Sequence, residues 1–290
     1  MDEREALGLL GAALPAAGDD AAVVGSTAIT TDMLHESTDF PAGTTRYTVG
    51  WRAVAASLSD LAAMGATPTA AVAAYAAEAF VDRELKAFVA GARDVCETVG
   101  ADYVGGDLDT HCEFTVATTA IGEATHPVYR SGASPGDRLC VTGTLGRSAA
   151  ALRLFDRGET ERANELFRFS PRIDVGRRLA GVGTAMMDSS DGLARSLHQL
   201  AEASDCGFAV DREAVPIDSA VAAVTDDPAD RWEAGVHFGE DFELVCTLPE
   251  DALQSVAADV STPLTPIGRA TEAEGVRVDG EPLADRGYTH

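Results

Sequence analysis

Residues 58–66 read Leu-Ser-Asp-Leu-Ala-Ala-Met-Gly-Ala and place one carboxylate, Asp60, in an otherwise apolar helix. The helical pattern begins near Thr45, after which apolar residues recur at three- and four-residue steps, at Trp51, Val54, Leu58 and Leu61. The helix ends at Gly65, which Pro68 follows. The residues one helical turn from Asp60 are Ala56, Ala63 and Met64. A carboxylate in such surroundings is either buried with a partner or bound to a cation.

Further acidic residues stand at predicted strand ends among apolar, Gly, Ser or Thr neighbours: Asp19, Asp20, Asp32, Asp107, Asp188 and Asp191. Each alone has a simpler explanation, a turn at 18–20 and at 105–107 and helix capping at 188–191. If Asp20, Asp32, Asp60, Asp107 and Asp188 converge, each pair ~4 Å apart costs about 4 kcal/mol at an effective dielectric near 20. Such a cluster needs cations, and all-oxygen ligands select Mg²⁺ or Ca²⁺. Carboxylate-bound magnesium in turn suggests a polyphosphate substrate.

The order of predicted elements indicates a two-domain α/β or α+β protein. A loop rich in turn residues at 126–136 separates the domains, which we place at residues 1–130 and 131–290. The first half is expected to contain helices at 2–14, 45–64 and 82–99 and strands at 21–25, 28–32, 69–77, 103–104 and 113–121. The second is expected to contain strands at 138–141, 184–187, 242–248 and one or two within 264–278, with helices between 148 and 180 and from 191 to about 203.

Composition excludes several classes of partner. The 290-residue chain has 47 acidic and 22 basic residues, a formal net charge of -25, and no lysine other than Lys86. This charge argues against binding to nucleic acid or anionic lipid, and we expect neither a nucleic-acid nor a membrane partner. Such acidity suits concentrated salt, where a Debye length of about 3 Å at ~1 M screens self-repulsion. Five scattered cysteines, no positively charged leader and no long apolar run predict a soluble cytoplasmic protein.

Several common catalytic signatures are missing from the sequence. It contains no Walker A motif, no G-x-S-x-G elbow and no H-E-x-x-H. The glycine turn at 143–148 could cradle a phosphate at a helix start, or it could be a structural turn. The residues alone therefore indicate a metal-dependent, nucleotide-using enzyme without naming its substrate.

An ordered set of motifs resembles the thiamine-monophosphate kinase family, within the ATP-using superfamily of aminoimidazole ribonucleotide synthetase. The motifs are Gly18-Asp19-Asp20, Thr30-Thr31-Asp32, Leu58-Ser59-Asp60-Leu61, Gly105-Gly106-Asp107, Arg130-Ser131-Gly132, Val141-Thr142-Gly143, Ser190-Asp191-Gly192-Leu193 and Gly239-Glu240-Asp241-Phe242. They span residue 18 to the C-terminus, about nine tenths of the chain. The resemblance implies two domains of the aminoimidazole ribonucleotide synthetase-like fold. The N-terminal mixed sheet would pair two copies into a homodimer.

The resemblance also implies a reaction and its residues. ATP would transfer its γ-phosphoryl group directly to thiamine monophosphate, in the last step of thiamine diphosphate synthesis, with several Mg²⁺ ions as cofactors. The implied magnesium ligands are Asp20, Thr30, Thr31, Asp32, Asp60, Asp107, Asp188 and Asp191. ATP would contact Gly106, Asp107, Arg130 and Ser190, and thiamine monophosphate would contact Asp39, Glu240 and Tyr288.

This sequence departs from the family pattern at three points. Asp39 stands where many members have His, Leu108-Asp109 interrupts the usual Gly-Gly-Asp-Thr-Thr, and Ser189 replaces an aliphatic residue. Two alternatives to the kinase remain. One is a sister enzyme with the same ATP site, such as an aminoimidazole ribonucleotide synthetase-like ligase, and the other is a non-catalytic nucleotide- or metal-binding module.

Overall fold

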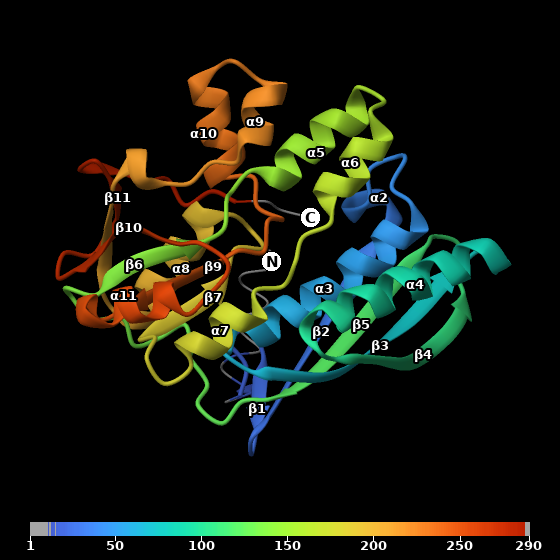
Figure 1. Cartoon of the computed structure of the whole chain (residues 1–290), viewed down its shortest axis with the longest axis horizontal. Helices are drawn as coiled ribbons and strands as arrows, with labels where there is room; N and C mark the ends of the chain where they lie inside the picture. Colours follow the sequence, from blue (N-terminus) through green and yellow to red (C-terminus); the bar gives the residue numbers. More distant parts are fainter. Residues whose placement is uncertain (1–10, 12, 15, 288–290) are drawn as a thin grey trace.

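The computed structural model describes residues 11, 13–14 and 16–287, and these form two mixed β-sheets with helices (Figure 1). The predicted helix at 2–14 and the predicted substrate contact Tyr288 lie wholly or largely outside the described residues. Among the described residues, no helix is both long and apolar enough to cross a bilayer.

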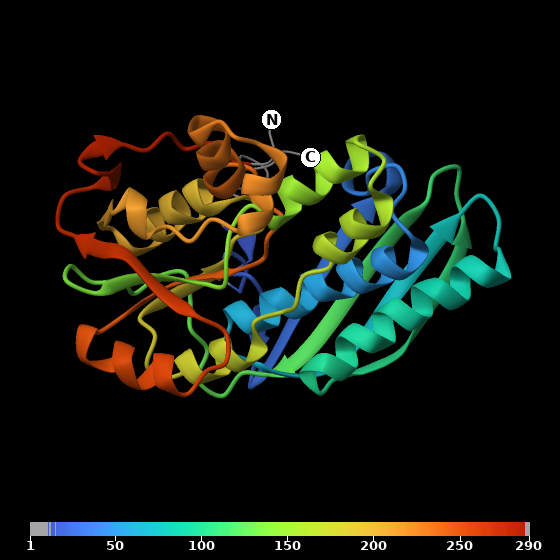
Figure 2. The ribbon, with the colours of Figure 1, turned by 45° about the horizontal axis from the view of Figure 1, so that its top comes forward.

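The first sheet contains five strands in the order β1-β2-β5-β3-β4, in which only β3 and β4 pair in parallel. Its strands are β1 (Ala22–Val24), β2 (Thr27–His35), β3 (Thr67–Ala77), β4 (Asp102–Thr110) and β5 (Thr115–Glu123). Its helices are α2 (Glu36–Asp39), α3 (Arg46–Ala63) and α4 (Asp82–Val99). Helices α3 and α4 run side by side across one face of this sheet (Figure 2).

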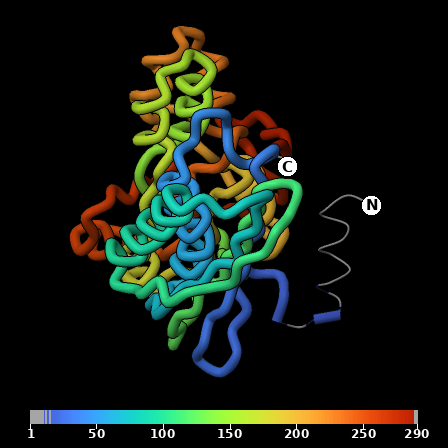
Figure 3. Tube along the Cα trace, turned by 90° about the vertical axis from the view of Figure 1, so that its right-hand side faces the viewer, coloured from blue at the N-terminus to red at the C-terminus, as the bar shows by residue number. Residues whose placement is uncertain are grey.

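The second sheet contains seven strands in the order β12-β11-β8-β10-β6-β9-β7, in which β8 and β11 pair in parallel. Its strands are β6 (Arg138–Thr142), β7 (Ala185–Asp188), β8 (Gly207–Val210), β9 (Leu244–Leu248), β10 (Leu264–Thr271), β11 (Gly275–Val278) and β12 (Glu281–Pro282). The helices of this half are α5 (Arg147–Asp156), α6 (Thr160–Phe167), α7 (Ile173–Leu179), α8 (Leu193–Ser204), α9 (Ser219–Val224), α10 (Pro228–Val236) and α11 (Glu250–Ala258). Helices α5, α6, α9 and α10 stand together at the top of Figures 1 and 3.

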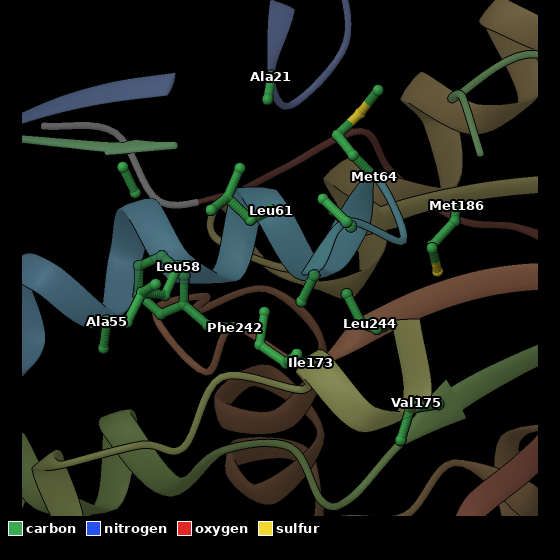
Figure 4. Close-up of a cluster of buried hydrophobic side chains, with 14 of the residues drawn as sticks. Ala21, Ala55, Leu58, Leu61, Met64, Ile173, Val175, Met186, Phe242 and Leu244 are labelled. Carbon is green, nitrogen blue, oxygen red and sulfur yellow. The ribbon is translucent and has the colours of Figure 1, made fainter. Parts of the chain in front are cut away.

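Helix α3 is the central element of the fold. The hydroxyl of Thr45 accepts a hydrogen bond from the Thr48 amide at its start, and the left-handed Gly65 follows its end. It is buried on nearly all sides, because the first sheet and α4 cover part of it while α7 and β7 of the second half cover the rest. Figure 4 shows Leu58 and Leu61 of α3 and Met64, which follows the helix, in one cluster with Ile173, Phe242 and Leu244. The helix thereby joins the two halves of the molecule.

The structure corrects several predicted boundaries. Asp32 and Asp107 do not stand at strand ends, since β2 continues to His35 and β4 to Thr110. The sequence analysis assigned no element to 204–241 or 249–263, where the structure has β8, α9, α10 and α11. Helix α8 begins at Leu193 rather than at Asp191.

Candidate active site

Three carboxylates meet where α3 crosses the second sheet. Asp20 comes from the turn before β1, Asp60 from the last turn of α3 and Asp188 from the end of β7, and each offers an oxygen within 4.8 Å of the other two. The central position of α3 causes this meeting, because its C-terminal turn lies beside both the first strands and β7. The sequence analysis placed all three residues in the acidic set, and the structure brings them together.

Burial and mutual repulsion disfavour the charged forms of these acids. Desolvation raises the pKa of Asp188 to about 7, and the neighbouring charge of Asp20 adds to the rise. The pKa of Asp60 is raised well above its ordinary value by burial first, and then by the charges of Asp32, Asp188 and Asp20. Burial also raises the pKa of Asp32. A cation would reverse these shifts, because it stabilises the ionised carboxylates.

Hydroxyl groups hold the carboxylates in place. Thr30 on β2 donates a hydrogen bond to Asp60, and Ser57 donates to Asp32 Oδ2 at 2.5 Å. Ser59 donates to Asp188 Oδ2 at 2.6 Å. Ser57 and Ser59 interrupt the alanine-rich sequence of α3, which is the signal by which sequence reasoning could have included them in the site. These hydrogen bonds orient the acidic groups as outer-shell partners orient metal ligands.

Arg130 is the cation that the structure sets beside this cluster. Its Nε and Nη2 donate to Asp20 at 3.2 and 3.0 Å, and its backbone amide donates to Asp19 Oδ1 at 2.7 Å. Because the four carboxylates of Asp20, Asp32, Asp60 and Asp188 outnumber the guanidinium of Arg130, the ionised cluster keeps an excess of negative charge. The donors are carboxylate and hydroxyl oxygens, which is the set that suits Mg²⁺. The residues present therefore fit the predicted metal.

The remaining predicted metal ligands, and the predicted ATP contact Ser190, lie apart from the cluster or at its margin. Ser190 and Asp191 follow Asp188 in the turn between β7 and α8, and the Ser190 amide lies 3.4 Å from Asp188 Oδ1. The Thr31 side chain is exposed on the opposite face of β2 from Thr30, where its hydroxyl donates to the Thr118 carbonyl at 2.8 Å. Within one copy of the chain, the Thr31 side chain therefore does not join the cluster.

Gly106 and Asp107 lie on β4, which β3 and β5 separate from β2. Three strand spacings correspond to roughly 14 Å, and α3 fills the helix-covered face between them. Asp107 is exposed and accepts a 2.9 Å hydrogen bond from the Leu108 amide. Gly106 also has a packing role, because a Cβ there would lie 1.7 Å from the Ala73 carbonyl oxygen. One subunit does not bring these two residues to the carboxylates.

A pocket of about 380 Å³ lies beside Gly106, between α4 and the edge strand β4. Its wall is mostly apolar and aromatic, from Tyr75, Phe88, Val89 and Tyr103, with Gly105, Gly106 and Asp107 at the strand. Such a lining suits a flat ring with a few polar edges.

Asp39 and Glu240 line a second pocket of about 240 Å³ between the two halves. Asp39 ends α2, and its Oδ2 accepts hydrogen bonds from the His35 amide at 2.6 Å and the Thr38 hydroxyl at 2.7 Å. The remaining wall includes the aromatic rings of Phe40, Phe167 and Phe238. The structure thus brings together the two described residues that were predicted to contact the substrate.

In the glycine turn at 143–148, two backbone amides at the start of α5 are already bonded within the protein. The backbone amides of Gly146 and Ser148 both donate to the buried carboxylate of Asp241. Desolvation raises the pKa of Asp241 to about 7, although these two hydrogen bonds lower it. These contacts favour the structural interpretation of this turn over the phosphate-cradle interpretation.

Sequence reasoning missed Arg52, which is 3 % exposed in the middle of α3. Its Nη2 lies 2.6 Å from Glu240 Oε2, so that it forms a buried ion pair beside the pocket lined by Asp39 and Glu240. The available signal was an arginine in the interior of a helix whose neighbouring residues are mostly apolar.

Two models of the AIR synthase related protein family match the chain, the N-terminal domain at residues 18–124 and the C-terminal domain at 134–281. The thiamine-monophosphate kinase of Halobacterium salinarum is 64 % identical over the full length of both chains. The thiamine-monophosphate kinase of Methanospirillum hungatei is 39 % identical, over 100 % of this chain and 99 % of its own.

The solved structure described as AaThiL complexed with AMPPCP and TMP superposes with a TM-score of 0.90 at 28 % identity. The match covers 99 % of this chain and 96 % of that one. Because the family models cover both halves and the relatives match over their whole length, the chain belongs to the AIR synthase related family and, within it, to the thiamine-monophosphate kinases.

Proposed function

We infer that this chain phosphorylates thiamine monophosphate with ATP and yields thiamine diphosphate and ADP. The observation that carries this function is full-length identity of 64 % to a thiamine-monophosphate kinase, in a chain whose acidic motif residues meet in one cluster. The acceptor is a phosphate oxygen that is already anionic at neutral pH, since the second pKa of a phosphate monoester is near 6. The reaction therefore needs no protein nucleophile, and alignment with charge neutralisation lowers the barrier.

We propose that Asp20, Asp60 and Asp188, with Asp32, Thr30 and the adjacent Asp191, hold the magnesium ions. Magnesium ions held there would neutralise charge on the transferred phosphoryl group and on the ADP that leaves. Arg130 lies beside the carboxylate cluster and would exchange part of its contact with Asp20 for a contact with a phosphate oxygen. Ser190 lies two residues after Asp188 and is the other residue that we assign to the phosphates of ATP.

The pocket between Asp39 and Glu240 suits the thiamine part of the acceptor. Thiamine carries a positively charged thiazolium ring, and this pocket joins carboxylates to the faces of Phe40, Phe167 and Phe238. Carboxylates and aromatic faces both attract an organic cation. We assign Asp39 and Glu240 to this ring, and Tyr288 remains a predicted contact.

We further propose that two copies of the chain pair through the open face of the first sheet. This face presents apolar side chains that are 36–63 % exposed, at Ile29, Met33, Val72 and Ile121. Exposed apolar surface of this kind favours association. Pairing would give Gly106 and Asp107 of the partner subunit a route to the carboxylate cluster, with the purine of ATP in the pocket beside β4. The wide separation of β2 and β4 within one subunit supports this arrangement.

A direct test is to incubate the purified chain with ATP, Mg²⁺ and thiamine monophosphate at high salt and to separate the products by chromatography. We expect ADP and thiamine diphosphate in equal amounts. ATP hydrolysis without thiamine diphosphate would favour a sister enzyme with another acceptor, whereas ATP binding without turnover would favour a binding module. A second assay with unphosphorylated thiamine checks that the acceptor is a phosphate.

A further inference from the structure

Arg52 lies at the junction of the two halves, and its guanidinium forms hydrogen bonds to residues of the second half. Its guanidinium donates to the side-chain carboxylate of Glu240 at 2.6 Å, to the Glu240 carbonyl at 3.3 Å and to the Phe167 carbonyl. The same group lies over the Phe167 ring, with its Cζ 3.6 Å from the ring centroid. One side chain of α3 thus fixes both the backbone and the carboxylate of a residue in the substrate pocket.

The loop that carries Glu240 needs such support. Glu240 and Phe242 have left-handed φ angles of 61° and 53°, which are costly for residues other than glycine. The Glu240 amide donates to the Ser190 carbonyl at 2.6 Å, and the Ser148 hydroxyl donates to the Glu240 carbonyl at 2.6 Å. These two contacts hold the Glu240 backbone, whereas Arg52 is the contact that also bonds its carboxylate.

The carboxylates around Arg52 indicate that its role is to position Glu240 rather than to neutralise the negative charge of the pocket. Three carboxylates act on its guanidinium, those of Glu240, Asp241 and Asp39. The pocket itself is lined by the carboxylates of Asp39, Asp156 and Glu240, so Arg52 leaves it with an excess of negative charge. Arg52 instead fixes the orientation of the Glu240 carboxylate, because its planar guanidinium bonds this carboxylate, the Glu240 carbonyl and the Phe167 carbonyl in one fixed, forked geometry.

The position of Arg52 along α3 also relates the pocket to the metal cluster. Arg52 and Asp60 are eight residues apart in one unbroken helix, which corresponds to roughly 12 Å of rise. Arg52, which holds the Glu240 carboxylate, and Asp60, which belongs to the carboxylate cluster, are thus carried by the same rigid helix. A shift of the Glu240 loop relative to α3 would change the distance between acceptor and metal.

We propose that Arg52 is a positioning residue for the acceptor, orienting the Glu240 carboxylate toward the thiazolium ring and fixing the pocket at a set distance from the carboxylate cluster. This proposal rests on the assignment of the pocket to thiamine monophosphate. Arg52 acts through Glu240, so the two residues form one functional unit.

Steady-state kinetics of Arg52→Met, Glu240→Gln and the double variant test this unit. We expect Arg52→Met to raise the KM for thiamine monophosphate at least tenfold while the KM for ATP changes less than threefold. The double variant should be little worse than the poorer single variant, because the second change removes a partner already lost. Arg178→Met, which removes a solvent-accessible ion pair with Asp259 just after α11, is the matched control and should leave both KM values unchanged.

Arg52→Lys keeps the charge but not the fork, and it covers the case in which Arg52→Met does not fold. We expect this variant to show the same selective rise in the KM for thiamine monophosphate. An unchanged KM for thiamine monophosphate in both Arg52 variants, or additive effects of Arg52→Met and Glu240→Gln, would overturn the proposal. Absence of thiamine diphosphate with the wild-type chain would instead refute the proposed function, so the two failures are distinguishable.

Discussion

The Ser59 hydroxyl donates a 2.6 Å hydrogen bond to Asp188 Oδ2, which links α3 to the end of β7. Both residues are buried, and Asp60 follows Ser59 directly. One hydrogen bond therefore sets the distance between two elements that each contribute a carboxylate to the cluster.

Ser59→Ala should lower the affinity of the site for Mg²⁺ while leaving the fold intact. Loss of an outer-shell partner typically costs 10- to 100-fold in metal affinity or activity. We therefore expect the Mg²⁺ concentration that gives the half-maximal rate to rise about tenfold. Titration of the initial rate with Mg²⁺ measures this shift. Ser255→Ala, which removes a hydroxyl that accepts from Arg178 on the surface, is the control and should titrate like the wild type.

Asp60→Asn should raise the stability of the metal-free protein. Replacing a buried carboxylate by an amide relieves its desolvation and its repulsion with Asp188 and Asp20, and we expect a gain of about 1–3 kcal/mol in the free energy of unfolding. The same variant should lose the rise in melting temperature that Mg²⁺ gives the wild type. Thermal melts with and without Mg²⁺ check both effects, and a metal-free variant less stable than the wild type would contradict them.

The metal-free protein should lose stability as the pH rises from about 4 to about 7. The folded chain keeps a proton on Asp188, whose pKa is about 7, whereas the unfolded chain releases it near the ordinary value of 3.8. The unfolded state therefore binds fewer protons in this range, and the free energy of unfolding falls with pH. Denaturant unfolding at pH 5 and pH 7.5 measures the slope, which Asp188→Asn should reduce. An equal slope in that variant is the contrary result.

Met33→Arg tests the pairing of the open sheet faces. A charge in the middle of that apolar face should shift the protein from dimer to monomer in analytical ultracentrifugation and lower the rate by at least tenfold. Phe80→Arg, an equally drastic change at an exposed position between β3 and α4, should leave the assembly intact. A fully active Met33→Arg monomer would refute the contribution of the partner subunit's residues.

Salt dependence tests the interpretation of the acidic composition. With a net charge of -25, self-repulsion should destabilise the fold when the Debye length grows from about 3 Å at 1 M salt to about 10 Å at 0.1 M. We expect the melting temperature to fall as NaCl or KCl is diluted, more steeply than for a chain of balanced charge. A melting temperature independent of salt would show that repulsion among the acidic residues does not destabilise the fold.

The sequence predicted the elements whose pattern is long and whose ends are marked by capping residues. The helix α3 begins at Arg46, one residue after the predicted start, with Thr45 as its N-cap, and it ends before Gly65 as predicted, while α4 has the predicted range of 82–99. The short elements α9 and β8 were not predicted, because four to six residues give too few repeats to establish a period.

The candidate site could be predicted only as a set of residue types. Periodicity placed Asp60 in a buried helix, but the order of strands in the sheet decides which acids it meets. Asp188 joins it because β7 lies beside α3, and Asp107 does not because β4 is at the far edge. Arg52 could not be assigned in advance, since its partner Glu240 is 188 residues away in the sequence.

The most direct measurement is the formation of thiamine diphosphate from ATP and thiamine monophosphate by the wild-type chain and by Asp60→Asn, at high salt over a range of Mg²⁺ concentrations. The wild type should form thiamine diphosphate only when Mg²⁺ is present, and Asp60→Asn should be slower by several orders of magnitude at every concentration. Equal rates for the two proteins, or no thiamine diphosphate from either, would contradict a kinase that works through this carboxylate cluster.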